Sequence, residues 1–135
     1  GKGSITAVYS VLVDGDDVNE PIADAVRGIL DGHIVLSRDL AARNHYPAID
    51  ILGSISRTMP DVTDVEHRRR AGQVREWLAT LRDSEDLISV GAYVKGTTPR
   101  IDAAVERRDA ISRFLCQPAD TRVEFPAALA GLQAL

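Results

Sequence analysis

An almost uninterrupted apolar run at residues 4–13 restricts the possible folds of this chain more than any other feature. The run reads Ser-Ile-Thr-Ala-Val-Tyr-Ser-Val-Leu-Val, in which β-branched residues are frequent and charged residues are absent. Such a run is typical of a strand in a sheet covered on both faces, since neither side of the strand has to face water. We therefore predict a buried strand. Because it begins so close to Gly1, we expect the chain to be a fragment whose sheet continues before it.

The segments that follow alternate between helix and strand patterns, and strand, helix, strand, helix in this order indicates an α/β domain. Pro21 suits the first turn of a helix because its missing N–H is not needed there, and Gly32 is expected to end that helix in a left-handed conformation. The predicted elements after the first strand are an acidic loop at 14–20, a helix at about 21–31, a buried strand at 33–37 and a short helix at 38–43.

Beyond residue 60 the pattern is helical, so we predict an all-α bundle at 61–135 after the α/β part at 1–60. Thr63 and Glu66 have the spacing of a capping box, in which the two side chains satisfy backbone amides reciprocally. The predicted helices run from about 64 to 90, from Pro99 to before Pro118, and from 126 to 135, with an irregular piece between Gly91 and Gly96. The side chains expected to face the core are Val74, Trp77, Leu78, Leu81, Ile88, Ile101, Ala104, Val105, Ile111, Phe114, Leu115, Leu129 and Leu132.

The composition restricts the class of function. With 135 residues, 44% hydrophobic and 27% charged, the chain suits one compact domain or a small domain joined to part of another. A net charge of −4 gives no overall basic field, which argues against a dedicated nucleic-acid binder. Cys116 is the single cysteine, which forbids an internal disulfide, and no apolar run reaches the ~18 residues of a membrane span. We therefore expect a cytoplasmic protein.

Several patterns that imitate known sites are rejected. Residues 1–4 and 95–97 combine Gly and Lys, but in the wrong order or place for a phosphate loop, which has Gly-Lys-Ser/Thr entering a helix. The three histidines and Cys116 lack the spacing of metal ligands. Cys116 also has no adjacent histidine, so we interpret it as a half-buried thiol rather than a nucleophile.

Arg57 is the best candidate for chemistry on the residues alone. It ends the segment 46–57 and is surrounded by small polar side chains. Arginine is the side chain best suited to stabilise charge on a transferring phosphoryl group, although composition alone favours a structural salt bridge. The basic run 67–70 is interpreted as a solvated helix face, with a partner surface as the alternative. The acidic loop 14–20 is a solvated connection or, at the carboxyl end of a strand, a binding loop.

Short motifs resemble, in order and spacing, the catalytic subunits related to F-type ATP synthase β. They are Gly3-Ser4-Ile5-Thr6, Asp16-Asp17, His33-Ile34-Val35-Leu36-Ser37-Arg38, Tyr46-Pro47-Ala48-Ile49-Asp50 and Ser54-Ile55-Ser56-Arg57. The segment Gly91-Ala92-Tyr93-Val94-Lys95-Gly96 is more similar to the flagellar and type III secretion export ATPases. The resemblance covers nearly the whole chain. It implies the C-terminal strands and helices of a RecA-like nucleotide-binding domain at residues 1–60 and a helical C-terminal domain at 61–135.

The resemblance also implies roles for individual residues. Arg57 matches the arginine finger that reaches the γ-phosphate held by the neighbouring subunit of a hexamer. Tyr46 matches the tyrosine that packs on adenine in the subunit's own site, and Phe125 the phenylalanine on adenine's other side, while Ala119 replaces a further aromatic. The residues that match the loop facing the central stalk are Asp16, Asp17, Asn19 and Glu20. Residues 91–98 match a second stalk-contacting turn.

The implied function is that of a protein-secreting ATP hydrolase that uses ATP with Mg²⁺ and binds a coiled-coil stalk and export chaperones or substrates. It would act in the cytoplasm, peripherally at the export apparatus of the inner membrane. Neither the phosphate loop nor the metal-binding acidic residues of the family can be located in this sequence, so we expect the chain alone to be inactive. The alternatives are a non-catalytic module that binds a stalk or chaperone, and the catalytic subunit of a rotary ATP synthase, which residues 93–96 disfavour.

Overall fold

The computed structural model describes residues 3–13 and 21–135, which belong to two compact units, Gly1–Asp31 and Gly32–Leu135. In the first unit residues 3–13 have no regular secondary structure, and the side chains of residues 4–12 are exposed, with Ile5 at 98% and Leu12 at 95%. The predicted buried strand is therefore wrong for this structure. A strand buried on both faces needs neighbouring strands to satisfy its backbone, and no described strand pairs with this segment.

Helix α1, Pro21–Ile29, confirms the predicted helix, which ends slightly earlier than expected. Gly32 does not end it in a left-handed conformation. It is instead the first residue of strand β1, Gly32–Leu36. A Cβ atom at Gly32 would lie 2.6 Å from the carbonyl oxygen of Ile55. The glycine is thus explained by the close approach of a second strand rather than by its φ angle.

That second strand is β2, Ile49–Ser56, which pairs antiparallel with β1 to form a two-stranded sheet within the described part of the chain. The predicted strand at 33–37 is confirmed by β1, although it is only partly buried. Between them lies α2, Arg38–Ala42, in which the Ser37 hydroxyl accepts a hydrogen bond from the Leu40 amide at 3.3 Å. Strand β2 was not predicted from the sequence.

Strand β2 contains a bulge opposite residue 34. His33 pairs with Ile55 and Val35 with Asp50, so residues 51–54 have no partner in the ladder. The Asp50 carboxylate accepts hydrogen bonds from the amides of Leu52 at 2.9 Å and Gly53 at 3.0 Å, which folds the bulge back on the residue that precedes it. Any Cβ at Gly53 would lie 2.8 Å from the same carboxylate. The bulge is therefore compact.

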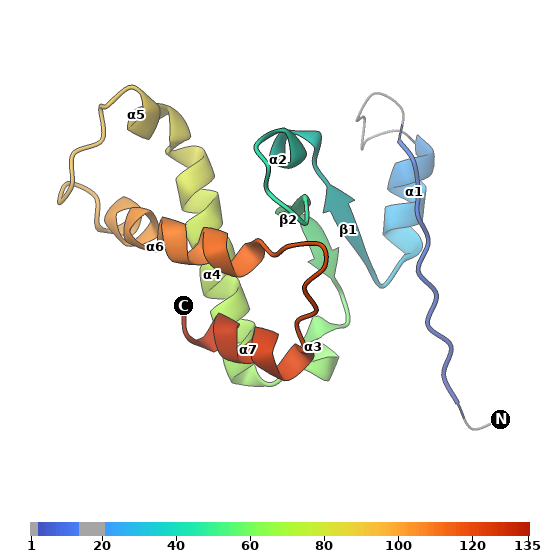
Figure 1. The fold of residues 1–135 in the computed structure, drawn as a ribbon. Helices are drawn as coiled ribbons and strands as arrows, with labels where there is room; N and C mark the ends of the chain where they lie inside the picture. The colour runs from blue at the N-terminus through green and yellow to red at the C-terminus, as the bar shows by residue number, and fades with distance from the viewer. Residues whose placement is uncertain (1–2, 14–20) are drawn as a thin grey trace. The chain divides into compact units, whose positions relative to one another are not determined.

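The remainder of the second unit is helical (Figure 1). Its helices are α3 (Met59–Val62), α4 (Val65–Asp83), α5 (Glu85–Ser89), α6 (Pro99–Leu115) and α7 (Phe125–Gln133). Helices α6 and α7 both pack on α4 and enclose the core, which consists of Val74, Trp77, Ala104, Ile111 and Leu132. Each of these side chains had been predicted to face inward from its helical spacing.

Two details of the helical part differ from the prediction. The cap of α4 is Asp64, whose carboxylate accepts from the His67 amide at 2.7 Å, while the Thr63 hydroxyl donates to the Met59 carbonyl of α3 at 2.6 Å. The predicted capping box is therefore wrong, because Thr63 is already used to end the preceding helix. The expected helix at 64–90 is also divided at Ser84 into α4 and α5. Gly91 and Gly96 have φ angles of 72° and 93°, which confirms an irregular loop before Thr98 and Pro99 begin α6. Among the described helices, none is long and apolar enough to cross a membrane.

Candidate functional site

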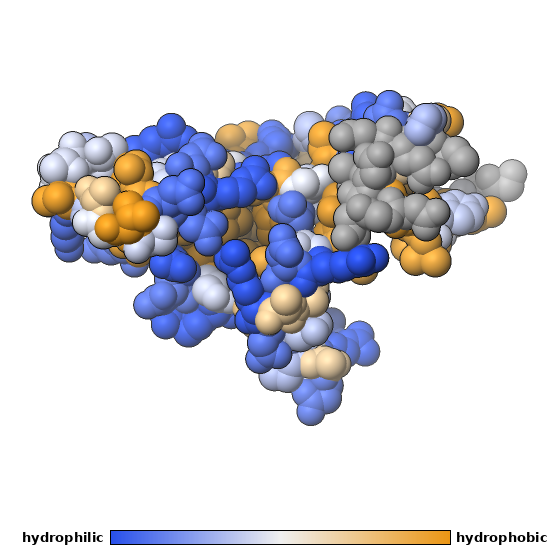
Figure 2. Space-filling model, turned by 90° about the horizontal axis from the view of Figure 1, so that it is seen from above, coloured by the Kyte–Doolittle hydropathy of each residue, from blue (hydrophilic) through white to orange (hydrophobic). Residues whose placement is uncertain are grey.

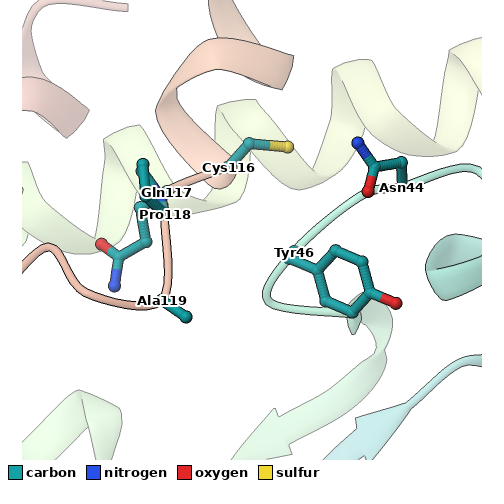
Figure 3. A pocket seen from close by; sticks show the side chains of 6 residues that line it. All are labelled: Asn44, Tyr46, Cys116, Gln117, Pro118 and Ala119. Carbon is teal, nitrogen blue, oxygen red and sulfur yellow. The ribbon is translucent and has the colours of Figure 1, made fainter.

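A pocket of about 390 Å³ lies where two distant segments of the second unit meet (Figure 3). One segment is the loop after α2, and the other follows the end of α6. The two are joined by a hydrogen bond from the Gln117 amide to the Tyr46 carbonyl at 2.9 Å. The lining side chains are Asn44, Tyr46, Cys116, Gln117, Pro118 and Ala119. This volume is within the range of sites for small organic ligands.

The local backbone explains why Tyr46 is presented to this pocket. Helix α2 ends at Ala42, Asn44 then adopts the left-handed conformation with φ 58°, and the His45 amide donates to the Leu40 carbonyl at 2.9 Å. The chain turns again through a cis Tyr46–Pro47 peptide before β2. The Tyr46 side chain remains 51% exposed, so one part of its surface is free to contact a ligand.

Cys116 is paired with His45, contrary to the prediction that it has no adjacent histidine. The Cys116 Sγ lies 3.3 Å from His45 Nδ1, and the two residues are 71 positions apart in the sequence. Helix α6 brings the thiol to the α2 loop, a long-range approach that no local pattern encodes. Cys116 is partly buried, which confirms that part of the prediction.

A second hollow, of about 600 Å³, lies between β2 and the helices α4, α5 and α6. It is lined by aliphatic, polar and charged side chains, including His45, and contains no Tyr, Trp or Phe. An exposed ion pair between Arg43 and Glu85, with N···O 3.2 Å, connects α5 with the end of α2. Because it lacks a Tyr, Trp or Phe ring, this hollow is less suited than the Tyr46 pocket to a planar ligand.

The other predicted site residues do not line the Tyr46 pocket. Arg57 follows the last residue of β2 and is exposed, next to a Ser56–Thr58 hydroxyl contact of 3.4 Å. Phe125 is the first residue of α7, is 67% exposed, and packs against the His67 ring at a centroid distance of 6.3 Å. The structure therefore brings Ala119, but not Phe125, to Tyr46. Asp16, Asp17, Asn19 and Glu20 lie outside the described residues.

The loop at residues 91–98 is held by a residue that the sequence analysis did not identify. The Asp102 carboxylate accepts a hydrogen bond from the Tyr93 hydroxyl. It also accepts from the Gly96 amide, whose nitrogen lies 3.0 Å from one carboxylate oxygen and 3.1 Å from the other. The Tyr93 bond lowers the pKa of Asp102, with the Gly96 amide as the next cause, and the same bond raises the pKa of Tyr93. An acidic residue in the first turn of a helix, just after a glycine-bracketed loop, is the signal that could have indicated this role.

Most of the basic run at 67–70 is used within the protein. Glu66 accepts from Arg69 at 2.6 Å and 2.8 Å and from Arg70 at 3.1 Å, and Arg68 donates to the Pro60 carbonyl at 2.9 Å. The hydrogen bonds from Arg69, followed by that from Arg70, lower the pKa of Glu66 to about 2. Among the residues that the structure describes, no group of three or more His, Cys, Asp or Glu side chains is placed to hold a metal ion.

The second unit thus combines a β-hairpin, a helical bundle and a pocket lined by Tyr46. Comparisons with known proteins identify the family. Residues 63–134 match the T3SS EscN ATPase C-terminal domain, and residues 1–56 match the nucleotide-binding domain of the ATP synthase alpha/beta family. The chain belongs to the family of flagellum-specific and type III secretion ATPases, as its motifs predicted.

Individual relatives agree with this assignment. The chain is 52% identical over 133 residues to the flagellum-specific ATP synthase of Treponema pallidum, which covers 98% of the chain and 30% of that protein. It is 54% identical over 119 residues to the SPI-2 type 3 secretion system ATPase of Salmonella typhimurium, covering 88% of the chain and 28% of that protein. The chain thus spans under a third of the length of these relatives and corresponds to the C-terminal part of such ATPases.

Solved structures share the fold. The assembled ATPase EscN from the enteropathogenic E. coli type III secretion system superposes with a TM-score of 0.92 at 45% identity, covering 96% of this chain and 32% of that one. EscN in complex with its central stalk EscO superposes with a TM-score of 0.78 at 42% identity, over 84% of this chain and 28% of that one.

Proposed function

We propose that this chain acts within a hexameric ATPase that drives protein export, and that it contributes one wall of the adenine site through Tyr46 and an arginine finger through Arg57. The observation that carries the proposal is the Tyr46 pocket. It offers a half-exposed aromatic ring together with Pro118 and Ala119, which suit the faces of a planar base. The amides of Asn44 and Gln117 can exchange hydrogen bonds with the edge of the base.

The pocket fits a base better than it fits phosphates. No lysine or arginine lines it, whereas Arg57 lies at the far end of β2. This separation supports the proposal that the two residues contact different nucleotides. Tyr46 would contact the base of the nucleotide bound to its own subunit, and Arg57 a phosphate of the nucleotide held by a neighbouring subunit. Phe125 would reach the base only after a rearrangement at the start of α7, because its ring now contacts His67. Ala119 leaves this side of the pocket open.

When bound, Mg²⁺ would neutralise the developing charge on the transferred phosphoryl group. Neither the phosphate loop nor the metal-binding acidic residues of the family can be located in this sequence, so we propose that the chain by itself does not hydrolyse ATP. Magnesium-dependent turnover by the purified chain, abolished by Arg57→Ala, would contradict this. Export chaperones and substrates, and a peripheral position at the inner-membrane export apparatus, are further parts of the proposal.

The test is a graft of this chain onto a complete relative. The chain replaces the matching segment of the flagellum-specific ATP synthase of Bacillus subtilis, to which it is 49% identical over 133 residues. We expect the graft to hydrolyse ATP. Arg57→Ala should lower kcat by about 10³-fold or more, with little change in nucleotide affinity, because an arginine finger acts on the transition state.

Tyr46→Ala should instead weaken nucleotide binding and raise KM, while Tyr46→Phe, which keeps the ring, should leave both nearly unchanged. Nucleotide affinity is measured with a fluorescent ATP analogue and turnover by phosphate release. An assembled graft without ATPase activity, or an Arg57→Ala variant with normal kcat, refutes the proposed function.

A second candidate function, stalk binding without chemistry, is favoured by the surface around α5. Leu87, Val90 and Val94 are 49%, 75% and 62% exposed, and the Asp102 hydrogen bonds hold the loop that carries Val94. Figure 2 shows apolar side chains exposed among hydrophilic ones on the molecule. The complex of EscN with its stalk EscO supports a stalk protein as the partner. Val94→Asp should abolish co-purification of the stalk protein, and Val62→Asp, at an even more exposed site on α3, should not.

A further inference from the structure

The bulge of β2 leaves four consecutive carbonyl groups without partners in the ladder, those of residues 51–54. All four accept hydrogen bonds from side chains instead. Arg75 donates to the carbonyls of Ile51, Leu52 at 3.3 Å and Ser54 at 3.2 Å, and His33 Nε2 donates to that of Gly53 at 3.1 Å. The bulge is thus satisfied mainly by one residue that lies outside the hairpin, on helix α4.

Only an arginine has the geometry for these contacts. The guanidinium group is a rigid, planar fork with donors on both terminal nitrogens, and here one terminal nitrogen serves Ile51 and Ser54 while the other serves Leu52. A lysine has one donor atom and no fork. The contact joins two parts of the second unit, the hairpin and the helical bundle, which makes Arg75 a specific link between α4 and β2.

The bulge lies directly before Arg57. Ser54 is the last residue whose carbonyl Arg75 holds, and β2 ends at Ser56. The Ser54 hydroxyl also donates to the Asp50 carbonyl at 2.6 Å and accepts from the Val35 amide at 2.9 Å, so the two ends of the bulge are fixed to each other and to β1. The place from which Arg57 projects therefore depends on the bulge, and Arg75 ties the bulge to helix α4.

We propose that Arg75 is a positioning residue for Arg57. It holds the end of β2 relative to α4, so that a shift of the helical bundle is transmitted to the arginine finger. This inference rests on the proposed function of Arg57. Displacing a group that stabilises the transition state by about 1 Å costs on the order of 100-fold in rate. We therefore expect Arg75→Ala to lower kcat by roughly 10- to 100-fold, with KM for ATP nearly unchanged.

The experiment uses the grafted ATPase described above and four variants: Arg75→Ala, Arg75→Lys, Arg69→Ala, and the double variant Arg57→Ala/Arg75→Ala. Arg69→Ala is the matched control, because it removes an arginine of the same helix that hydrogen-bonds Glu66 instead of the carbonyls of β2. It should leave kcat unchanged. Arg75→Lys keeps the charge but loses the fork, so its kcat should fall between those of Arg75→Ala and the unsubstituted graft.

The double variant separates positioning from general damage. If Arg75 acts through Arg57, then removing Arg75 has no further effect once Arg57 is absent, and the double variant should have the kcat of Arg57→Ala alone. Hydrogen exchange provides a readout besides activity. In this chain, Arg75→Ala should speed exchange of the amides of residues 52–56 while amides in the α4–α6 core stay protected.

Each result has one interpretation. A normal kcat in Arg75→Ala, together with a strong loss in Arg57→Ala, overturns the positioning role and leaves the proposed function standing. A normal kcat in Arg57→Ala refutes the proposed function itself. If the losses in Arg57→Ala and Arg75→Ala multiply in the double variant, Arg75 has a structural role only. If Arg75→Ala does not fold, the same comparisons made with Arg75→Lys decide the question.

Discussion

Two glycine-to-alanine substitutions that add the same methyl group should have opposite effects on stability. At Gly32 the new Cβ would lie 2.6 Å from the Ile55 carbonyl oxygen and 3.2 Å from the Ser56 Cα, both backbone atoms of β2. Cβ atoms almost never approach another atom closer than 3.0 Å, so the strands must separate by at least about 0.4 Å. At Gly72, inside α4, a Cβ would meet nothing within 4 Å.

These geometries set the expected magnitudes. Gly32→Ala forces backbone shifts, and overpacking of this kind costs about 1–3 kcal/mol of unfolding free energy. Gly72→Ala removes an exposed glycine from a helix interior and should stabilise the chain by about 1 kcal/mol. Unfolding in urea is followed by circular dichroism and by the fluorescence of Trp77, the single tryptophan, which is buried in the core. A Gly32→Ala chain as stable as the unsubstituted one would refute the close approach of β1 and β2.

The remaining predictions concern the core, the acid stability and the pocket. Ile111 is 1% exposed, so Ile111→Ala should lower the unfolding free energy by about 2–5 kcal/mol, measured in the same urea titration. The pKa of Glu66 is lowered from 4.5 to about 2, so its ion pairs with Arg69 and Arg70 stabilise the fold above pH 4.5. This contribution is lost as the pH falls towards 2. Glu66→Gln should therefore weaken the pH dependence of the unfolding free energy between pH 4.5 and 2 only. Cys116 lines the Tyr46 pocket, so ADP bound to the grafted ATPase should slow the alkylation of Cys116 by iodoacetamide. An alkylation rate that does not depend on ADP would mean that the adenine base binds outside this pocket.

Sequence patterns predicted the helices better than the sheet, for a physical reason. The side chains of Trp77, Ala104 and Ile111 meet within one bundle, and their helical spacing alone shows which face each presents. Residues 4–13 have an equally strong strand pattern, but a strand exists only with paired neighbours, and the described chain has none for them. Strand β2 was missed because its bulge interrupts the alternation by which an exposed strand is recognised.

The candidate site shows the same division between local and long-range information. The motif resemblance selected Tyr46, and the structure places it in a pocket. The motifs could not show that Cys116 Sγ lies 3.3 Å from His45 Nδ1, or that Arg75 hydrogen-bonds β2. Both contacts join segments more than 20 residues apart and depend on how α4 and α6 pack. The roles of Arg57 and Phe125 remain predictions that the grafted ATPase can test.

Strand β2 and its flanks are attached to the helical bundle at two places, and the two attachments use different helices. Before the strand, the amide of Gln117, just beyond α6, binds the Tyr46 carbonyl. Within the bulge, Arg75 of α4 holds the carbonyls that precede Arg57. Helices α4 and α6 share one core, so they move as a body more readily than they separate. A shift of the bundle against the hairpin would therefore act on Tyr46 and Arg57 together. If these residues serve the nucleotides of two adjacent sites, then one movement would change the base contact in one site and the phosphate contact in the next.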